Sequence, residues 1–269
     1  MIAALPLRPG SRLWDTLTQR RPLMIFLDFD GTLAPLAPTP RAARLPEATR
    51  VIVRRLARAP GCTVVVISGR ALKDLRAQVN VPGIVYAGNH GLEIQGPGMR
   101  WQYPLPVAYR RLQGQVRRDL AARVRPIPGV LIEDKGMTFS VHYRLVRPRD
   151  QATVRRAVLS VVRQPMARGE IRLTSGKQVI EIRPAVAWHK GTAVRWLMDK
   201  QRCIPGSRQA YAVYIGDDRT DEDAFRAVGS AGLTIRVGRS RASAASYALK
   251  TPAAVRAFLK CVYTLRKGG

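Results

Sequence analysis

The chain has 269 residues, of which 46% are hydrophobic, and carries a formal net charge of +28. This length suits one large domain or two of ordinary size, and the hydrophobic fraction is enough for a buried core. No apolar run approaches the roughly 18 residues of a membrane span, and the first residues do not resemble a secretory signal. Three scattered cysteines without metal-ligand spacing indicate a reducing compartment. We therefore expect a soluble, cytoplasmic protein with no membrane partner.

The positive charge is almost all arginine and is spread along the whole chain. Such a charge attracts phosphate-bearing substrates, and equally nucleic acid or anionic lipid. Arginine used liberally on solvated faces would give the same composition without any binding role. The charge alone therefore does not decide between these classes.

The first predicted strand, Leu23–Leu27, is an apolar run that leads directly to two acidic residues, Asp28 and Asp30. Such a run is typical of a strand buried in a parallel sheet, whose carboxyl end opens into a ligand crevice. Residues i and i+2 of a strand point the same way, so we expect both carboxylates to face one small volume. A divalent cation would neutralise their repulsion, and oxygen ligands favour Mg²⁺. Solvated acids at an ordinary strand end are the alternative.

Short apolar runs alternate with helical patterns along the rest of the chain. The sequence predicts helices over 46–57 and 71–79 and strands over 63–67, 84–87, 211–215 and 233–237. This alternation is typical of a doubly wound parallel α/β sheet, in which every strand ends at the same edge. Trp14 and Leu17 indicate a short helix that packs before the first strand.

Residues 97–187 follow a different pattern and predict a smaller α+β cap with the order α-β-β-α-β-β. The expected helices cover 106–124 and 149–162, and the expected hairpins pair 129–133 with 137–145 and 170–174 with 178–183. Apolar and polar residues alternate strictly over 137–145, which is typical of a sheet with one buried face. His142 and Arg144 would share its polar face. The core domain would then consist of residues 1–96 and 188–269.

Three further polar groups are expected at the same edge of the core sheet. Ser68-Gly69-Arg70 follows a predicted strand, where a hydroxyl and backbone N–H groups would bind an anion, although the tripeptide is also a common turn. Lys190 lies near a helix start, where the helix dipole disfavours it unless it has an anionic partner. Residues 216–223 include five acids. Glu222 and Asp223 suit a helix start, whereas Asp217 and Asp218 are better explained by a bound cation.

These motifs, in this order, resemble the haloacid-dehalogenase superfamily of phosphotransferases. They are Asp-Phe-Asp-Gly-Thr-Leu, Ser-Gly-Arg, the lysine after the insert and Gly-Asp-Asp-x-Thr-Asp-Glu-Asp. Within that superfamily the chain looks like the trehalose-6-phosphate phosphatases. The finer match consists of Gly88–Gly91, Glu133–Gly136, His142–Arg144, Gly176-Lys177 and Glu181–Pro184.

The resemblance implies Mg²⁺-dependent hydrolysis of trehalose 6-phosphate through an aspartyl-phosphate. Asp28 would be the nucleophile, Asp30 the acid and base, and Ser68 and Lys190 would bind the phosphoryl group. Mg²⁺ would be bound by Asp28, the backbone carbonyl of Asp30 and Asp217. The residues expected to orient these groups are Arg70, Asp218 and Asp221. The residues implied to contact substrate are Gly31, Thr32, His90, Gly91, Glu133, Lys135, Arg144, Lys177 and Glu181.

Two other functions remain as alternatives. The same chemistry would serve another sugar phosphate, such as sucrose phosphate or mannosyl-phosphoglycerate. A nucleic-acid-binding protein on a catalytically idle scaffold would suit the charge, but the cap strands lack the clustered aromatics that stack bases. The resemblance further implies a functional pairing with a trehalose-phosphate synthase.

Overall fold

The computed structural model describes residues 3–4, 12–19, 22–176, 178–203, 208–240 and 242–267. It divides into two compact units, which we call the core (residues 1–102 and 188–269) and the cap (residues 103–187). The sequence places the first boundary at residue 97. Residues 99–102 instead form a strand of the core sheet, so the cap begins at Tyr103. In the described parts of the chain, no helix has the length and apolar character needed to cross a bilayer.

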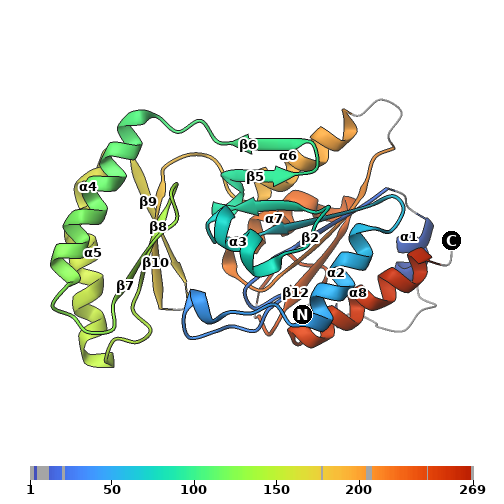
Figure 1. The fold of residues 1–269 in the computed structure, drawn as a ribbon, viewed down its shortest axis with the longest axis horizontal. Coiled ribbons are helices and arrows are strands. Elements are labelled where there is room, and N and C mark those ends of the chain that lie inside the picture. Colours follow the sequence, from blue (N-terminus) through green and yellow to red (C-terminus); the bar gives the residue numbers. More distant parts are fainter. Residues whose placement is uncertain are drawn as a thin grey trace. The chain divides into compact units, whose positions relative to one another are not determined.

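A large, mainly parallel sheet forms the centre of the core (Figure 1). In spatial order its described strands are β1 (Ala3–Ala4), β13 (Tyr247–Leu249), β12 (Leu233–Val237), β11 (Tyr211–Gly216), β2 (Leu23–Leu27), β3 (Cys62–Ile67), β4 (Val85–Gly88), β5 (Glu93–Gly96) and β6 (Met99–Gln102). Among these described strands, β5 pairs antiparallel with both β4 and β6, and the other pairings are parallel. The doubly wound α/β fold class expected from the sequence is confirmed.

Helices pack on both faces of the core sheet. They are α1 (Arg12–Gln19), α2 (Glu47–Ala57), α3 (Leu72–Val79), α6 (Lys190–Arg202), α7 (Glu222–Val228) and α8 (Pro252–Lys267). On β2, Leu23 and Ile25 belong to an apolar cluster that includes residues of α1, α2, α3 and α8, whereas Met24 and Phe26 pack with α6 and α7. Because strand side chains alternate between faces, the next even-numbered residue, Asp28, is directed to the side of α6.

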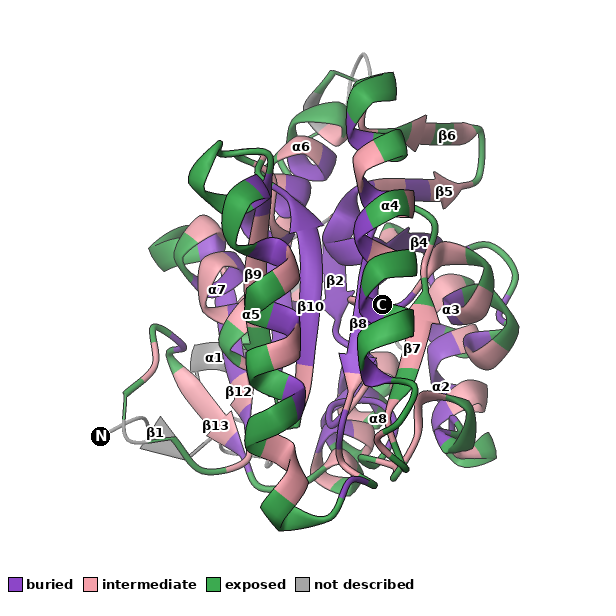
Figure 2. Ribbon diagram, turned by 90° about the vertical axis from the view of Figure 1, so that its left-hand side faces the viewer, coloured by how far each residue is buried: buried purple, intermediate pink, exposed green. Residues whose placement is uncertain are grey.

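The cap contains an antiparallel sheet and two long helices. In spatial order the strands are β7 (Leu131–Asp134), β8 (Phe139–His142), β10 (Val179–Pro184) and β9 (Ile171–Gly176), and the helices are α4 (Val107–Val124) and α5 (Gln151–Ala167). Helices and strands thus follow the expected α-β-β-α-β-β order. Buried valines of α5, Val154, Val158 and Val162, recur every four residues, whereas the outer faces of α4 and α5 are exposed (Figure 2). Such a one-sided apolar stripe is typical of a helix that covers one face of a sheet.

Short 3₁₀ helices occur at the connections. They cover Pro40–Ala42, Asn89–Gly91, Pro148–Asp150, Arg219–Asp221 and Gly229–Ala231. The second and fourth of these lie in segments that carry predicted site residues.

Candidate active site

Asp28 follows β2 in the interior of the core sheet. Its backbone N–H donates to the carbonyl of Ile215 on β11, 2.9 Å away, so the strand pairing continues through this residue. The side chain is buried, and its Oδ1 accepts a hydrogen bond from Lys190 Nζ at 2.7 Å. Burial raises the pKa of Asp28 well above its usual range, Lys190 opposes that shift, and Asp221 and Asp217 add to it.

Lys190 is the first residue of α6, and the sequence around it fixes where the helix begins. The His189 ring accepts a bond from the Thr192 N–H, and the Thr192 hydroxyl accepts one from the His189 N–H. The buried Lys190 Nζ lies 2.7 Å from an oxygen of Asp28 and 2.7 Å from one of Asp221. Burial lowers the pKa of Lys190, but the two carboxylates outweigh burial and raise it above its usual value. These partners account for a lysine at a helix start.

Asp221 is completely buried and accepts several hydrogen bonds. Its Oδ1 accepts from Lys190 Nζ and from the Tyr214 hydroxyl, both at 2.7 Å, and its Oδ2 accepts from the Asp218 N–H at 2.8 Å. Nothing in the sequence marks Tyr214 as a site residue, because an aromatic residue in an apolar strand is usually a packing residue. Its hydroxyl ties β11 to the acidic segment that follows.

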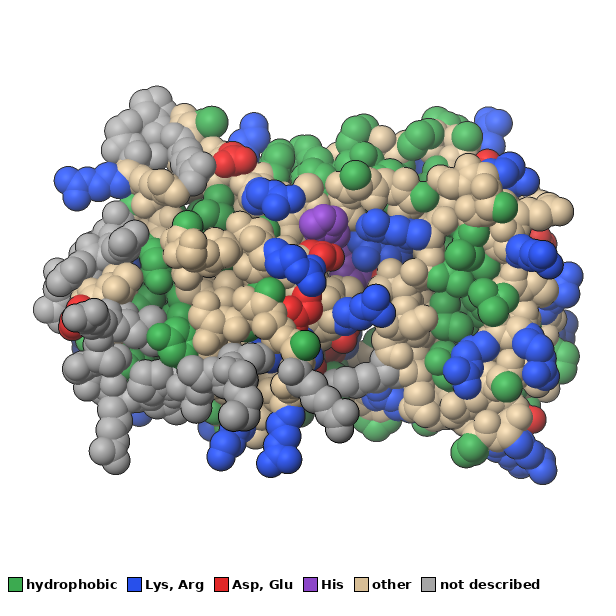
Figure 3. Space-filling view, turned by 180° about the vertical axis from the view of Figure 1, so that it is seen from behind, with side chains coloured by type: hydrophobic (Ala, Val, Ile, Leu, Met, Phe, Trp, Pro, Cys, Tyr) green, Lys and Arg blue, Asp and Glu red, His purple; other side chains and the backbone are tan. Residues whose placement is uncertain are grey.

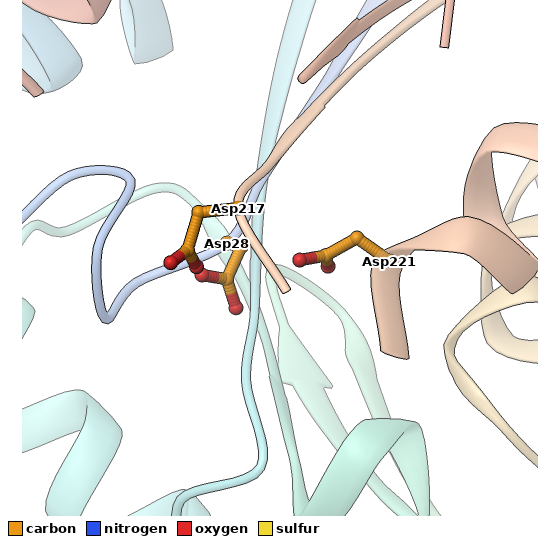
Figure 4. Close-up of side chains that lie close together, drawn as sticks. All are labelled: Asp28, Asp217 and Asp221. Atoms are coloured by element: carbon orange, nitrogen blue, oxygen red, sulfur yellow. The ribbon is translucent and has the colours of Figure 1, made fainter. Parts of the chain in front are cut away.

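Three carboxylates gather at this point of the core. Asp28, Asp217 and Asp221 each offer an oxygen, and these oxygens lie within 4.8 Å of one another. Figure 4 shows Asp28 and Asp217 side by side, with Asp221 reaching toward them. With one ammonium group among three buried or half-buried carboxylates, the group suits a bound cation. Carboxylate oxygens are ligands that Mg²⁺ prefers.

The turn after β2 requires glycine at position 31. Gly31 has a φ of +85°, and a Cβ there would collide with the carboxylate of Asp217. Thr32, the next residue, is fully buried. The Asp-x-Asp-Gly-Thr motif and the acidic segment are therefore in direct contact, as the common sheet edge predicted.

Asp30 and Asp28 have different hydrogen-bond partners. The Asp30 carboxylate makes two hydrogen bonds with the guanidinium of Arg70, at 2.7 and 2.8 Å. Strand alternation does not apply to this pair, because β2 ends at Leu27 and both residues follow it, so the expectation that the two carboxylates face one volume stays a prediction. Arg70 was expected to orient groups of the site, and its guanidinium pairs with Asp30 and also with Asp74 and the carbonyl of Pro40.

The loops after β3 and β4 form one hydrogen-bonded unit. The buried Ser68 accepts from the Arg70 N–H at its Oγ and from the His90 N–H at its carbonyl, at 3.2 and 2.9 Å. His90 is buried and has a φ of +58°. Gly91 follows with a φ of +89°, where a Cβ would collide with Ala193 of α6. The structure thus ties Ser68, Arg70, His90 and Gly91 to the same end of the core sheet.

The predicted substrate-binding residues of the cap form hydrogen bonds with one another and with nearby residues of the cap. Lys135 Nζ lies 2.9 Å from Glu181 Oε1, which also accepts from the Thr138 hydroxyl at 3.1 Å. Glu133 Oε2 lies 2.7 Å from His142 Nε2.

The predictions for two other cap residues, Arg144 and Lys177, were not confirmed. Arg144 was expected on the strand with His142, but β8 ends at His142, so Arg144 lies in the following turn. Lys177 lies outside the described residues.

Comparison with known proteins gives one consistent family. A family model described as trehalose-phosphatase matches residues 26–253. The trehalose-phosphate phosphatase of Mycobacterium marinum is 39% identical over 251 residues, which cover 91% of this chain and 62% of that protein. Trehalose 6-phosphate phosphatase RA3 of Zea mays is 35% identical over 254 residues and 88% of this chain, with 69% of that protein covered. This chain therefore spans about 62% of the length of the mycobacterial relative.

Solved structures show the same fold. The C-terminal domain of Candida albicans trehalose-6-phosphate phosphatase superposes with a TM-score of 0.80 at 23% identity, covering 99% of this chain and 98% of that one. The trehalose-6-phosphate phosphatase of Aspergillus fumigatus, at 26% identity, gives a TM-score of 0.63 and covers 100% of both chains. A haloacid dehalogenase-like hydrolase of Bacteroides thetaiotaomicron shares the fold with a TM-score of 0.59. The chain belongs to the trehalose-phosphatase family.

Proposed function

We propose that this protein is a Mg²⁺-dependent phosphatase that hydrolyses trehalose 6-phosphate to trehalose and phosphate. The observation that carries the proposal is the buried Asp28, held at 2.7 Å by Lys190 and grouped with Asp217 and Asp221. A carboxylate fixed beside a cation at the end of a central strand suits nucleophilic attack on a phosphate ester. The identity of the sugar rests on the family and on the motifs of the cap.

The reaction proceeds in two steps. Asp28 attacks phosphorus, the bond from phosphorus to the sugar oxygen breaks, and Asp30 gives its proton to that oxygen. A water molecule then gives a proton to Asp30 and attacks phosphorus, which releases phosphate and regenerates Asp28. Lys190 and the Ser68 hydroxyl bind the oxygens of the transferring phosphoryl group, where fixed positive charge and hydrogen bonds stabilise the transition state.

The metal would be Mg²⁺, bound by a carboxylate oxygen of Asp28, the backbone carbonyl of Asp30 and Asp217. Bound there, it would offset the negative charge that gathers between the nucleophile and the phosphate. Asp221 suits a different task. Because both of its oxygens already accept hydrogen bonds, its carboxylate is engaged in orienting Lys190 and the Asp218 backbone.

The cap would select the sugar. Glu133, Lys135 and Glu181 present charged groups that would bind adjacent hydroxyl groups of the sugar, and Arg144 in the turn after β8 would add another. We propose that Lys177 also contacts the sugar. The ion pair between Lys135 and Glu181 holds both side chains in fixed orientations, which lowers the entropy lost on binding. Gly31, Thr32, His90 and Gly91 would contribute to binding from the core.

Phosphate release from a panel of phosphorylated sugars tests this function. Trehalose 6-phosphate should be turned over far faster than sucrose phosphate, mannosyl-phosphoglycerate or glucose 6-phosphate, and chelation of Mg²⁺ should abolish release. Equal turnover of monosaccharide phosphates would contradict the assignment of the sugar. Loss of Mg²⁺ dependence would contradict the metal.

The substrate must come from a reaction that joins two glucose units with the phosphate in place, so we propose functional pairing with a trehalose-phosphate synthase. Copurification of the two proteins tests this pairing.

Nucleic-acid binding remains as an alternative function, because the chain carries a large positive charge. Figure 3 shows Lys and Arg side chains scattered over the face in view, and steeply salt-dependent binding to DNA or RNA would favour that alternative.

A further inference from the structure

The side chain of Arg70 joins three segments of the core beside Asp28. Its Nε donates to Asp30 Oδ2 at 2.7 Å and its Nη2 to Asp30 Oδ1 at 2.8 Å. Its Nη1 donates to Asp74 Oδ2 on α3 at 2.6 Å and to the carbonyl of Pro40 at 2.9 Å. The guanidinium therefore binds both oxygens of Asp30 with one edge while other segments hold its remaining nitrogen.

Arg70 is fixed by contacts that do not involve Asp30. Its side chain is only 6% exposed, and its guanidinium carbon lies 5.1 Å from the centre of the Phe29 ring. Its backbone N–H donates to Ser68 Oγ. Asp74 balances its charge at the far side. A guanidinium held in this way keeps its position whether or not Asp30 moves.

In the part of the chain that the structure describes, the turn that carries Asp30 gives its carboxylate no hydrogen bond of its own. Asp30 lies in the turn after β2, and its side chain is 34% exposed. A carboxylate at such a position populates several rotamers unless a partner selects one. Two parallel hydrogen bonds from one guanidinium fix both the place and the plane of a carboxylate, which a lysine ammonium cannot do.

We propose that Arg70 is a positioning residue, which orients the Asp30 carboxylate toward the substrate oxygen and the attacking water. This inference rests on the proposed function, because it concerns the acid and base of that reaction. Arg70 itself exchanges no proton, since its guanidinium stays charged in proteins. Asp74 acts one contact further away, by holding Arg70.

The test separates the two chemical steps with 4-nitrophenyl phosphate. Nitrophenolate leaves without a proton from the enzyme, so the first step needs Asp28 but not Asp30, whereas the second step still needs Asp30 to accept a proton from water. In Arg70→Ala we expect a rapid release of nitrophenolate that is stoichiometric with enzyme, followed by a steady state slowed by about 10²-fold, the cost of a misplaced catalytic group. Asp30→Asn should give the same pattern.

Two matched variants sharpen the result. Arg70→Lys keeps the charge but not the paired hydrogen bonds, so its steady state should also be slow, and Asp74→Asn should give a smaller loss of the same kind. If Arg70→Ala does not fold, these two variants carry the test. The inference is overturned if the rapid phase slows as much as the steady state, if both remain normal, or if lysine restores full activity. A wild-type protein that hydrolyses neither this ester nor trehalose 6-phosphate would instead overturn the proposed function.

Discussion

Lys190 Nζ lies 2.7 Å from Asp28 Oδ1, although the two residues are 162 positions apart in the chain. The whole cap lies between them in the sequence. The ion pair therefore forms only where the chain returns to the core, at the first residue of α6. The position of this helix start, set by the His189–Thr192 capping interaction, determines where the ammonium lies.

Replacing the nucleophile should stop the reaction without unfolding the protein. Asp28→Asn keeps the size of the side chain and removes a carboxylate that burial already disfavours, so the free energy of unfolding should not fall. Turnover of trehalose 6-phosphate should fall by at least about 10³-fold, as for other enzymes that lose a nucleophile. Phosphate release and urea unfolding, measured on the same preparation, check both parts. Substantial residual turnover would exclude Asp28 as the nucleophile.

Removing the ammonium should destabilise the core. Lys190→Met leaves Asp28 and Asp221 buried without their shared cation, and breaking a buried ion pair in this way costs about 3–5 kcal/mol. The matched control is Arg195→Ala on the exposed face of the same helix, which should change the free energy of unfolding by less than about 0.5 kcal/mol. If urea unfolding shows the same loss of free energy for both substitutions, the buried ion pair does not stabilise the fold.

Stabilisation by Mg²⁺ should grow with pH. Because the pKa of Asp28 is raised in the folded protein, the folded state binds more protons than the unfolded state above the ordinary aspartate pKa. Stability without metal should therefore fall as pH rises from there through the folded pKa. Mg²⁺ competes with the proton and should reverse this loss.

Thermal unfolding with Mg²⁺ or with a chelator, at pH 5 and pH 8, measures this difference. The metal-induced rise in Tm should be larger at pH 8. Asp217→Asn should remove most of that rise at both pH values. A rise that is independent of pH, or one that survives in Asp217→Asn, would contradict the metal site.

Substitutions in the cap should weaken recognition of the sugar and leave the chemical steps at phosphorus unchanged. Glu181→Gln weakens the contact with Lys135, and we expect kcat/KM for trehalose 6-phosphate to fall by about 10- to 100-fold, as for a lost hydrogen bond to a charged group. Turnover of 4-nitrophenyl phosphate, which has no sugar, should stay near the wild-type value. Lys177→Ala should behave alike, and Glu170→Gln, at the exposed pair with Arg168, should change neither rate. Equal losses on both substrates would assign Glu181 a structural role.

The sequence predicted best where periodicity and chain order decide the structure. The buried run of β2 sits at the centre of the parallel sheet, and Trp14 and Leu17 are buried as expected. The contact between Asp28 and Lys190 follows from the rule that parallel strands end at one edge. These features depend on local patterns and on a topology rule, and both can be recognised in the sequence.

Other features depend on tertiary contacts that no local pattern records. The hairpin of β5 and β6 was missed, because both strands are short and carry polar residues at the end of the sheet. The alternation over 137–145 continues past the end of β8, since a turn can preserve the spacing of apolar residues without being a strand. The pairing of Asp30 with Arg70 joins residues 40 apart, and only the folded structure reveals it.

Trapping the phosphorylated enzyme tests the central claim most directly. Trehalose 6-phosphate is mixed with the Mg²⁺-loaded protein, the reaction is quenched in acid within one turnover, and peptides are analysed by mass spectrometry. A phosphoryl group on Asp28, absent from Asp28→Asn and from samples without substrate, is the expected result. Full turnover with no phosphoryl group on Asp28 at any quench time, or its presence on another residue, would contradict the proposed mechanism.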